Sequence, residues 1–310
     1  MIISASRRTD IPAFFSDWFY NRIEEGYLLV RNPMNHHQVS RINLSPEVVD
    51  CIVFWSKNPS KMMDRFNMLQ DYSFYFQFTL TGYGQRLEPN VPSWQETVST
   101  FRNLSDMIGK DRVIWRYDPI ILSRQLTIEY HADRFEEIAR HLSGKTGRCV
   151  ISFVDMYKKP KRNMASVPII EIQMEQMIKT ASILSRISSK YGIELTSCAE
   201  TTDLEQYGIN HGKCIDDKLI EKISGFTLAV KKDSTQRSEC NCVKSVDIGA
   251  YNTCVHECLY CYANYNYNRV HSNYASHDPQ SPLLFGKIRP EDKIHERKAE
   301  SCRKAQTPLF

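Results

Sequence analysis

Cysteines gather in one part of this 310-residue chain, where seven of its ten cysteines fall between residues 198 and 261. Three of them lie within eight residues, in the motif Cys254-Val-His-Glu-Cys258-Leu-Tyr-Cys261. Thiolates are the ligands that iron–sulfur clusters and many zinc sites take from proteins. Because three thiolates are one short of a closed four-ligand site, we predict a metal centre with one open coordination position at this motif.

Two plainer interpretations of the motif remain open. Zinc could be bound by the three thiolates together with His256 or a distant cysteine, although zinc sites more often use CxxC pairs. The three residues could also be unrelated buried cysteines, although such a local density is uncommon for that role. The spacing favours an iron–sulfur cluster over both.

A second set of cysteines precedes the motif, namely Cys198, Cys214, Cys240 and Cys242. Four thiolates are enough to close a second iron–sulfur cluster, and the same ligands also suit zinc. Any of the four could instead be structural. Cys51 lies within an apolar run and Cys149 begins another, so we expect both of these to be core residues.

Composition excludes several classes of protein. The chain is 42% hydrophobic and 25% charged, as is typical of a folded domain, and it is long enough to bury a core without disulfides. A net charge of +4 is weak evidence for a nucleic-acid or membrane partner. Arg7, Arg8 and Asp10 stand where a secretory signal would be apolar, and no apolar run could span a membrane. We therefore expect a cytoplasmic protein with reduced thiols and no membrane partner.

Strands and helices alternate through the first 200 residues. We predict strands over Ile2–Ser6, Asp50–Trp55, Ser73–Leu80, Arg112–Tyr117, Arg148–Val154 and Ile193–Ser197. We predict helices over Ile11–Glu25, Val91–Ile108, Thr127–Leu142 and Pro168–Tyr191. This alternation predicts an α/β fold with parallel strands, and about 40 residues per repeat favours a partial TIM-like (β/α) barrel. In such folds polar side chains at the carboxyl ends of the strands form the site.

The predicted barrel covers residues 1–270, and residues 198–262 form a cysteine-rich segment within it. Residues 271–310 are polar and contain several prolines. We predict that they form an extended tail that packs on the barrel, with a short helix over Arg289–Arg303.

The motif from Cys254 to Cys261, with an aromatic residue before its last cysteine, resembles the signature of the radical S-adenosylmethionine (radical SAM) superfamily. The resemblance implies that Cys254, Cys258 and Cys261 hold a 4Fe-4S cluster whose fourth iron binds the amino and carboxylate groups of S-adenosylmethionine. It also implies that one electron cleaves this cofactor to a 5′-deoxyadenosyl radical, which abstracts hydrogen from a substrate. Tyr260 matches the aromatic position beside the adenine.

Other segments resemble the photolyase-like branch of that superfamily, which includes spore photoproduct lyase. They are Ser56-Lys-Asn58, Thr79-Leu-Thr81, Leu87-Glu-Pro-Asn-Val-Pro-Ser93, Pro119-Ile-Ile121 and Tyr262-Ala-Asn264. The cysteine motif of that superfamily follows the first strand, whereas here it lies near the C-terminus. The chain also resembles an uncharacterised bacterial family with this C-terminal cysteine cluster.

This order of segments suggests a circularly permuted barrel. Ser245–Gly249 would take the place of the first strand and Ile2–Ser6 that of the second. Permutation is tolerated where the two termini lie close together, so we expect the tail to run back towards residue 1.

The Gly-Gly-Glu turn that binds the amino group of the cofactor in that superfamily is absent. By position, the resemblance implies that Asp10 or Thr9 binds the ammonium group and that Arg7 or Arg8 binds the carboxylate. Asp10 could equally be only a helix N-cap. Contacts to the ribose and methionine are expected from strand ends, at Gln77, Thr79, Arg116 or Asp118.

We therefore expect a radical SAM enzyme of unknown substrate, for which a nucleic acid or nucleotide is conceivable. A flavodoxin or ferredoxin would supply the electron. The second cysteine set would hold an auxiliary 4Fe-4S cluster, or one of its thiols would donate a hydrogen atom. The competing expectation is a non-enzymatic zinc- or iron–sulfur-binding module that serves nucleic-acid binding or electron transfer.

Overall fold

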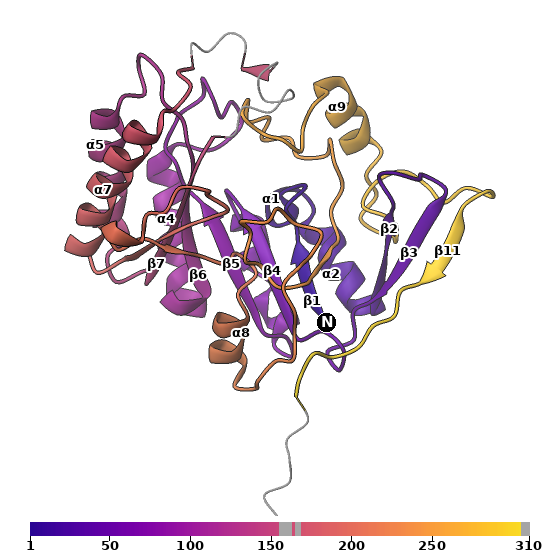
Figure 1. Cartoon of the computed structure of the whole chain (residues 1–310). Coiled ribbons are helices and arrows are strands. Elements are labelled where there is room, and N and C mark those ends of the chain that lie inside the picture. The colour runs from indigo at the N-terminus through magenta and orange to yellow at the C-terminus, as the bar shows by residue number, and fades with distance from the viewer. Residues whose placement is uncertain (155–162, 165–168, 305–310) are drawn as a thin grey trace, which may run out of the picture.

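An eight-stranded, all-parallel sheet forms the centre of the computed structural model, which describes residues 1–154, 163–164 and 169–304. The strand order is β10-β1-β4-β5-β6-β7-β8-β9. The strands are β1 (Ile2–Ala5), β4 (Cys51–Ser56), β5 (Phe74–Thr79), β6 (Val113–Ile120), β7 (Arg148–Phe153), β8 (Glu194–Ser197), β9 (Asn210–His211) and β10 (Val246–Asp247). The sheet curves into a partial (β/α) barrel, which is the fold class expected from the sequence (Figure 1).

Strands from opposite ends of the chain meet at one edge of this sheet. β10 runs parallel to β1, with Ile3 opposite Val246 and Ser4 opposite Asp247. The strand predicted over Ser245–Gly249 therefore lies beside the first strand of the chain. The cysteine motif, which follows β10, consequently begins at the same edge as the loop that follows β1.

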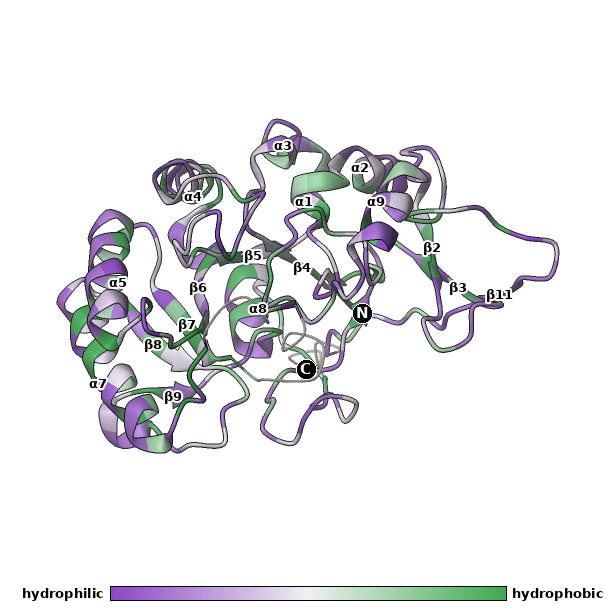
Figure 2. Ribbon diagram, turned by 90° about the horizontal axis from the view of Figure 1, so that it is seen from above, coloured by the Kyte–Doolittle hydropathy of each residue, from purple (hydrophilic) through white to green (hydrophobic). Residues whose placement is uncertain are grey.

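Helices cover the convex face of the sheet. They are α1 (Ile11–Phe14), α2 (Ser16–Glu25), α3 (Ser60–Met63), α4 (Trp94–Ile108), α5 (Ile128–Leu142) and α7 (Met174–Lys190). Short 3-10 helices lie at Phe66–Leu69, Lys110–Arg112 and Glu205–Tyr207. Figure 2 shows α4, α5 and α7 outside the curved sheet and α8 (Asp217–Ser224) on its inner side.

The alternation of side chains along each strand divides the core into two layers. On β5, the three phenylalanines at positions 74, 76 and 78 pack with the helices, whereas Tyr75 faces the inner side. Tyr75 packs there with Val53, Val150 and Ile215. The inner face is thus covered by the segment that contains α8 and the second cysteine set.

Capping explains where several helices begin and end. The side chain of Asp10 caps α1, but the backbone leaves helical geometry at Phe15, so the helix predicted over Ile11–Glu25 is two helices. Ser93 and Glu96 form a capping box, and α4 therefore begins at Trp94 and not at Val91. α7 begins only at Met174, and residue 168, where its start was predicted, lies outside the described residues.

A second, three-stranded sheet was not predicted. β2 (Tyr27–Arg31) pairs antiparallel with β3 (Gln38–Asn43), and β11 (Lys293–Glu296) pairs parallel with the other edge of β3. The helix predicted over Arg289–Arg303 was wrong, because this stretch pairs its backbone with β3 across 255 residues of sequence. Such long-range pairing overrides local helix propensity.

The tail returns to the start of the chain, as predicted (Figure 1). The amino group of Met1 donates to the backbone oxygen of Glu300 at 2.7 Å and forms an ion pair with buried Asp50. The backbone N–H of Cys302 donates to the same Asp50 carboxylate at 2.7 Å. The boundary predicted at residue 270 falls within α9 (Tyr267–Ala275).

Within the described part of the chain, no helix combines the length and the apolar character that crossing a membrane requires.

Candidate functional site

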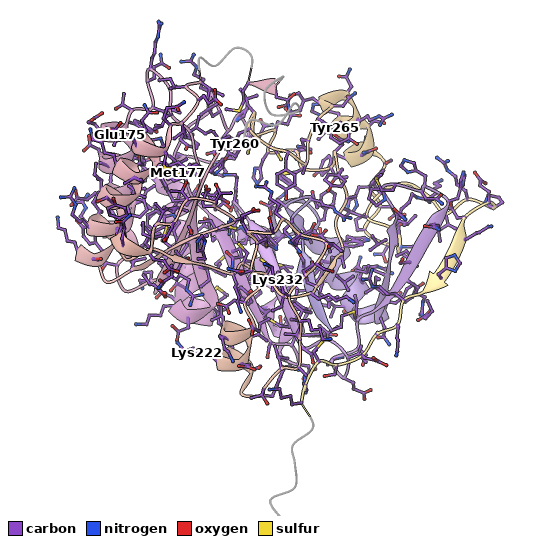
Figure 3. The ribbon with its side chains drawn as sticks, in the orientation of Figure 1. Glu175, Met177, Lys222, Lys232, Tyr260 and Tyr265 are labelled. Carbon is purple, nitrogen blue, oxygen red and sulfur yellow. The ribbon has the colours of Figure 1, made fainter. Side chains whose placement is uncertain are left out.

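The loop that carries Cys254, Cys258 and Cys261 lies over the carboxyl ends of the central strands. The backbone N–H of Leu259 donates to the oxygen of Leu87 at 2.9 Å. The side-chain amide of Asn90 donates to the oxygen of Val255 at 2.8 Å, and its backbone N–H to the oxygen of His256 at 3.4 Å. The segment after β5 therefore holds the loop in place, and Figure 3 shows Tyr260 above the sheet.

The thiols of the three cysteines in this loop lie close enough to interact electrostatically with one another. Cys254 and Cys258 are buried, and Cys261 is half-buried. Burial raises the pKa of all three thiols, and the neighbouring thiols raise the pKa of Cys254 and Cys258 further. Such thiols lose their protons readily only when a cation takes the place of the protons. This donor set fits a metal centre, for which the thiolates would need positive charge between them.

The arrangement does not match a site for a single metal ion. Among the described residues, no group of three or more His, Cys, Asp or Glu side chains is placed to hold one ion. A single zinc ion needs all its sulfur ligands at about 2.3 Å from one point. An iron–sulfur cluster binds each cysteine through a different iron and spreads its ligands more widely.

Asp10 connects the loop after β1 to the cysteine motif. Its carboxylate accepts from the backbone N–H of Ala13 at 3.0 Å, which confirms the helix N-cap expected at this position. It also accepts from the hydroxyl of Ser56 at 2.8 Å and from the backbone N–H of Lys57 at 2.7 Å. The imidazole Nε2 of His256 lies 3.0 Å from the same carboxylate. A role of Asp10 in binding the ammonium group of a cofactor stays a prediction.

Asp247 organises the loop between β1 and α1. Its carboxylate accepts from the hydroxyls of Ser4 at 3.0 Å and Ser6 at 2.6 Å, and from the backbone N–H of Arg7 at 2.8 Å. Gly249 permits this close approach, because a Cβ there would lie 2.1 Å from Oγ of Ser6. The strand β10 and the loop after β1 therefore pack closely, through the hydrogen bonds of Asp247 and the contact of Gly249 with Ser6.

The remaining residues predicted in this loop lie close to that edge. The guanidinium group of Arg8 is 3.8 Å from Asp247 and 5.1 Å from the ring of Tyr251. The side chain of Thr9 is buried, and no described residue pairs with its Oγ1. Roles of these residues and of Arg7 in cofactor binding stay predictions.

A buried ion pair beside Cys258 was not predicted as part of the site. Nζ of Lys57 lies 2.7 Å from Glu88, and the hydroxyls of Thr81 (2.7 Å) and Tyr260 also donate to Glu88. Burial alone would raise the pKa of Glu88, but Lys57 and the two hydroxyls together lower it. Burial and Glu88 raise the pKa of Tyr260 well above its usual range. The sequence signals for this ion pair were the segments Ser56-Lys-Asn58 and Leu87-Glu-Pro, which contain Lys57 and Glu88. Both segments resemble the photolyase-like branch, but the resemblance does not indicate that the two side chains meet.

The second cysteine set also comes together, on the inner face of the sheet. The sulfurs of Cys198 and Cys214 lie 3.2 Å apart. Sγ of Cys242 accepts from the backbone N–H groups of Cys214 at 3.3 Å and Ile215 at 3.4 Å. Hydrogen bonds from Cys214 and Cys240 lower the pKa of Cys242, and one from Cys214 lowers that of Cys198. The four thiols therefore form one hydrogen-bonded group.

Two of the strand-end residues predicted to touch a cofactor lie beside this second set. Arg116 donates to Sγ of Cys214 at 2.8 Å and forms an ion pair with Asp118. The side-chain amide of Gln77 donates to the backbone oxygen of Cys214 at 2.9 Å. Thr79 lies elsewhere, in a small cleft that Glu88 also lines. Roles of these four predicted residues in binding ribose or methionine stay predictions.

Trp55, on β4, lies near two arginines of this region. The guanidinium carbon of Arg116 is 5.1 Å from the centre of its ring, and that of Arg7 is 6.0 Å away. The hydroxyl of Tyr262, in the loop of the cysteine motif, donates to the backbone oxygen of Arg7 at 2.6 Å. The N-terminal loop and β4 thus connect the two groups of cysteines.

Comparison with known proteins places the chain in a family. No curated protein matches it. Among solved structures, it is similar to a putative alpha-L-fucosidase from Bacteroides thetaiotaomicron VPI-5482, with 10% sequence identity, a TM-score of 0.27 and coverage of 74% of this chain and 82% of that chain. A family model described as a domain of unknown function, DUF1848, matches residues 2–263. Since this match covers most of the sequence, including both cysteine groups, the chain belongs to the DUF1848 family.

Proposed function

We propose that this protein is a radical SAM enzyme, in which Cys254, Cys258 and Cys261 bind a 4Fe-4S cluster. The observation that carries the proposal is that one loop, at the carboxyl ends of parallel strands, presents two buried thiols and one half-buried thiol that interact electrostatically. When bound, the cluster and S-adenosylmethionine supply a 5′-deoxyadenosyl radical that abstracts hydrogen from a substrate. Three protein ligands suit this chemistry, because they leave one iron open to the cofactor.

The position of the loop in the sheet supports the proposal. In spatial order, β10 comes first, followed by β1, β4 and β5, so the cysteine loop follows the first strand of the sheet. This is the place that the motif occupies in the radical SAM superfamily. The contact between Met1 and Glu300 brings the tail to the start of the chain, as a circular permutation of such a barrel requires.

The residues around the loop would bind and orient the cofactor. The hydroxyl of Tyr260 donates to Glu88, and this hydrogen bond orients the ring of Tyr260 next to the cysteines of the loop. Lys57, buried beside Cys258, supplies positive charge next to the thiolates. The hydroxyl of buried Thr9, which has no hydrogen-bond partner among the described residues, and the guanidinium group of Arg8 offer polar groups at the β10 edge. A small flavodoxin or ferredoxin would provide the single electron.

The test is anaerobic reconstitution of the full chain with iron and sulfide. We expect brown protein that produces 5′-deoxyadenosine from S-adenosylmethionine and dithionite. Cys258→Ala should abolish this product, whereas Cys302→Ala, which alters a half-buried thiol in the tail, should leave it unchanged. Colourless wild-type protein with stoichiometric zinc, or full cleavage by Cys258→Ala, would contradict the proposal.

A further inference from the structure

We propose that Cys198, Cys214, Cys240 and Cys242 bind a second iron–sulfur centre, closed by four thiolates, on the inner face of the sheet. The inference does not depend on the chemistry proposed for the loop at Cys254. It rests on the geometry of the four thiols, on the way the sheet holds them, and on the charges that surround them.

The four thiols differ from ordinary buried cysteines of the same protein. The thiol of Cys51 donates to the backbone oxygen of Ile52 at 3.8 Å, and that of Cys149 donates to the backbone oxygen of Val150 at 4.0 Å. The sulfur of Cys214, in contrast, meets a second sulfur at 3.2 Å and a guanidinium group at 2.8 Å. Such polar surroundings suit a metal ligand and not a small apolar core residue.

The sheet fixes the segment that carries Cys214. The hydroxyl of Tyr75 and the amide of Gln77 both donate to its backbone oxygen, at 2.6 and 2.9 Å. The backbone N–H of Asp216 donates to the same tyrosine oxygen at 3.1 Å. Two strand residues therefore hold the turn before α8, and a site supported by strands keeps its geometry better than one on a free loop.

Hydrogen-bond donors point at the sulfurs. Two consecutive backbone N–H groups, of Cys214 and Ile215, donate to the sulfur of Cys242. Arg116, which is buried, donates to the sulfur of Cys214. Hydrogen bonds of this kind stabilise the negative charge on cysteines bound to iron and adjust the reduction potential of a cluster.

Positive charge is available for a buried cluster with four thiolates, which carries net negative charge. Arg116 donates to the sulfur of Cys214 at 2.8 Å, and both Arg7 and Arg116 interact electrostatically with Cys214. The two guanidinium groups lie near the same ring of Trp55, at 6.0 Å for Arg7 and 5.1 Å for Arg116. Buried charge needs such compensation, and these two guanidinium groups supply it.

The number of ligands determines what the second centre can bind. Four thiolates occupy all four irons, so this centre has no open position for S-adenosylmethionine. The centre at Cys254, Cys258 and Cys261 has one. The two centres should therefore respond differently to the cofactor, and this difference separates them experimentally.

The experiment compares iron content and electron paramagnetic resonance (EPR) spectra of three reconstituted full-length proteins. We expect about eight irons per chain in the wild type and about four in both Cys214→Ala and Cys258→Ala. S-adenosylmethionine should shift the EPR signal of reduced Cys214→Ala and leave that of reduced Cys258→Ala unchanged. Cys51→Ala, a change in the same inner layer, is the matched control and should keep about eight irons.

Two results would overturn the inference. One is full wild-type iron content in Cys214→Ala, and the other is zinc in place of iron in Cys258→Ala. Cys240→Ala, at the edge of the group, provides a second variant if Cys214→Ala fails to fold, and it should also lose about four irons. If Cys214→Ala loses iron while no protein cleaves S-adenosylmethionine, the second centre stands and the proposed function fails.

Discussion

The imidazole of His256, between the first two cysteines of the motif, lies 3.0 Å from the carboxylate of Asp10, which caps the first helix. Its other ring nitrogen lies 3.2 Å from the backbone oxygen of Asn90. One side chain thus joins the cysteine loop to two segments from the first third of the chain. His256 and Asp10 are both buried, so this contact holds the loop in a place that water does not reach.

His256→Ala should therefore loosen the cysteine loop. The substitution leaves the buried carboxylate of Asp10 with one partner fewer, which costs about 2 kcal/mol in free energy of unfolding. Urea denaturation of the metal-free protein measures this loss, and iron content after reconstitution should fall in parallel. His271→Ala, at an exposed histidine that pairs with Glu257, should change neither quantity. Equal stability of the two variants would show that the His256 contact is not structural.

Glu88→Gln should destabilise the protein more strongly than a surface substitution. The change leaves the ammonium group of Lys57 buried without its partner, at a cost of about 3 kcal/mol or more. The double variant Lys57→Met with Glu88→Gln should recover part of this loss, because it removes the unpaired charge. Glu96→Gln, at the exposed capping box of α4, should cost less than about 1 kcal/mol. The prediction fails if the double variant is less stable than the sum of the two single variants implies.

Gly249→Ala should separate β10 from the loop that follows β1. A Cβ at this position would lie 2.1 Å from Oγ and 2.6 Å from Cβ of Ser6, so the backbone must move. We expect a loss of about 2 kcal/mol in unfolding free energy and lower iron retention at the neighbouring cysteine loop. Gly147→Ala is the matched control, since its new Cβ would meet Asp111 only at 4.0 Å. Thermal unfolding of both variants tests this, and Gly249→Ala should have the lower melting temperature. Equal melting temperatures of the two variants would contradict the prediction.

His131 should make the protein less stable in mild acid. Burial, only partly offset by a hydrogen bond to the backbone oxygen of Ile121, lowers the pKa of His131 to about 4. The unfolded chain takes up this proton below pH about 6.5, whereas the folded chain does so only near pH 4, so stability falls as the pH drops through this window. The total loss is about 3 kcal/mol.

The variant His131→Phe isolates this effect. It loses the contacts to the hydroxyl of Tyr117 and the oxygen of Ile121, and it should therefore be less stable at neutral pH. The difference in unfolding free energy between wild type and variant should shrink from pH 6.5 to pH 4. A difference that stays constant with pH would rule out a neutral buried histidine.

The strands of the main sheet could be predicted from the sequence because their apolar residues alternate. The strand expected over Ser73–Leu80 is β5 (Phe74–Thr79), and the one expected over Arg148–Val154 is β7 (Arg148–Phe153). β11 could not be found in this way. Its four side chains are all exposed, and its pairing with β3 joins residues that are about 255 positions apart.

In the candidate site, too, local sequence patterns could be predicted and contacts between distant segments could not. Cysteine spacing predicted two groups, and the thiols of the second group interact in the structure, whereas metal binding by either group stays a prediction. The contacts of Lys57 with Glu88 and of His256 with Asp10 could not be predicted, because they join separate loops of the folded chain. Polar residues of this kind occur in every loop of the sequence, and only the fold selects which of them meet.

The pairing of β10 with β1 also bears on how the chain folds as the ribosome makes it. β1 is complete once residue 5 has emerged, but its partner at residues 246 and 247 follows only after most of the chain has been synthesised. At bacterial or eukaryotic rates of translation this delay is about 10 to 50 seconds. During that time the nascent protein exposes an unpaired strand edge, which is the kind of surface that joins other chains. Newly made protein should therefore depend on chaperones until β10 emerges.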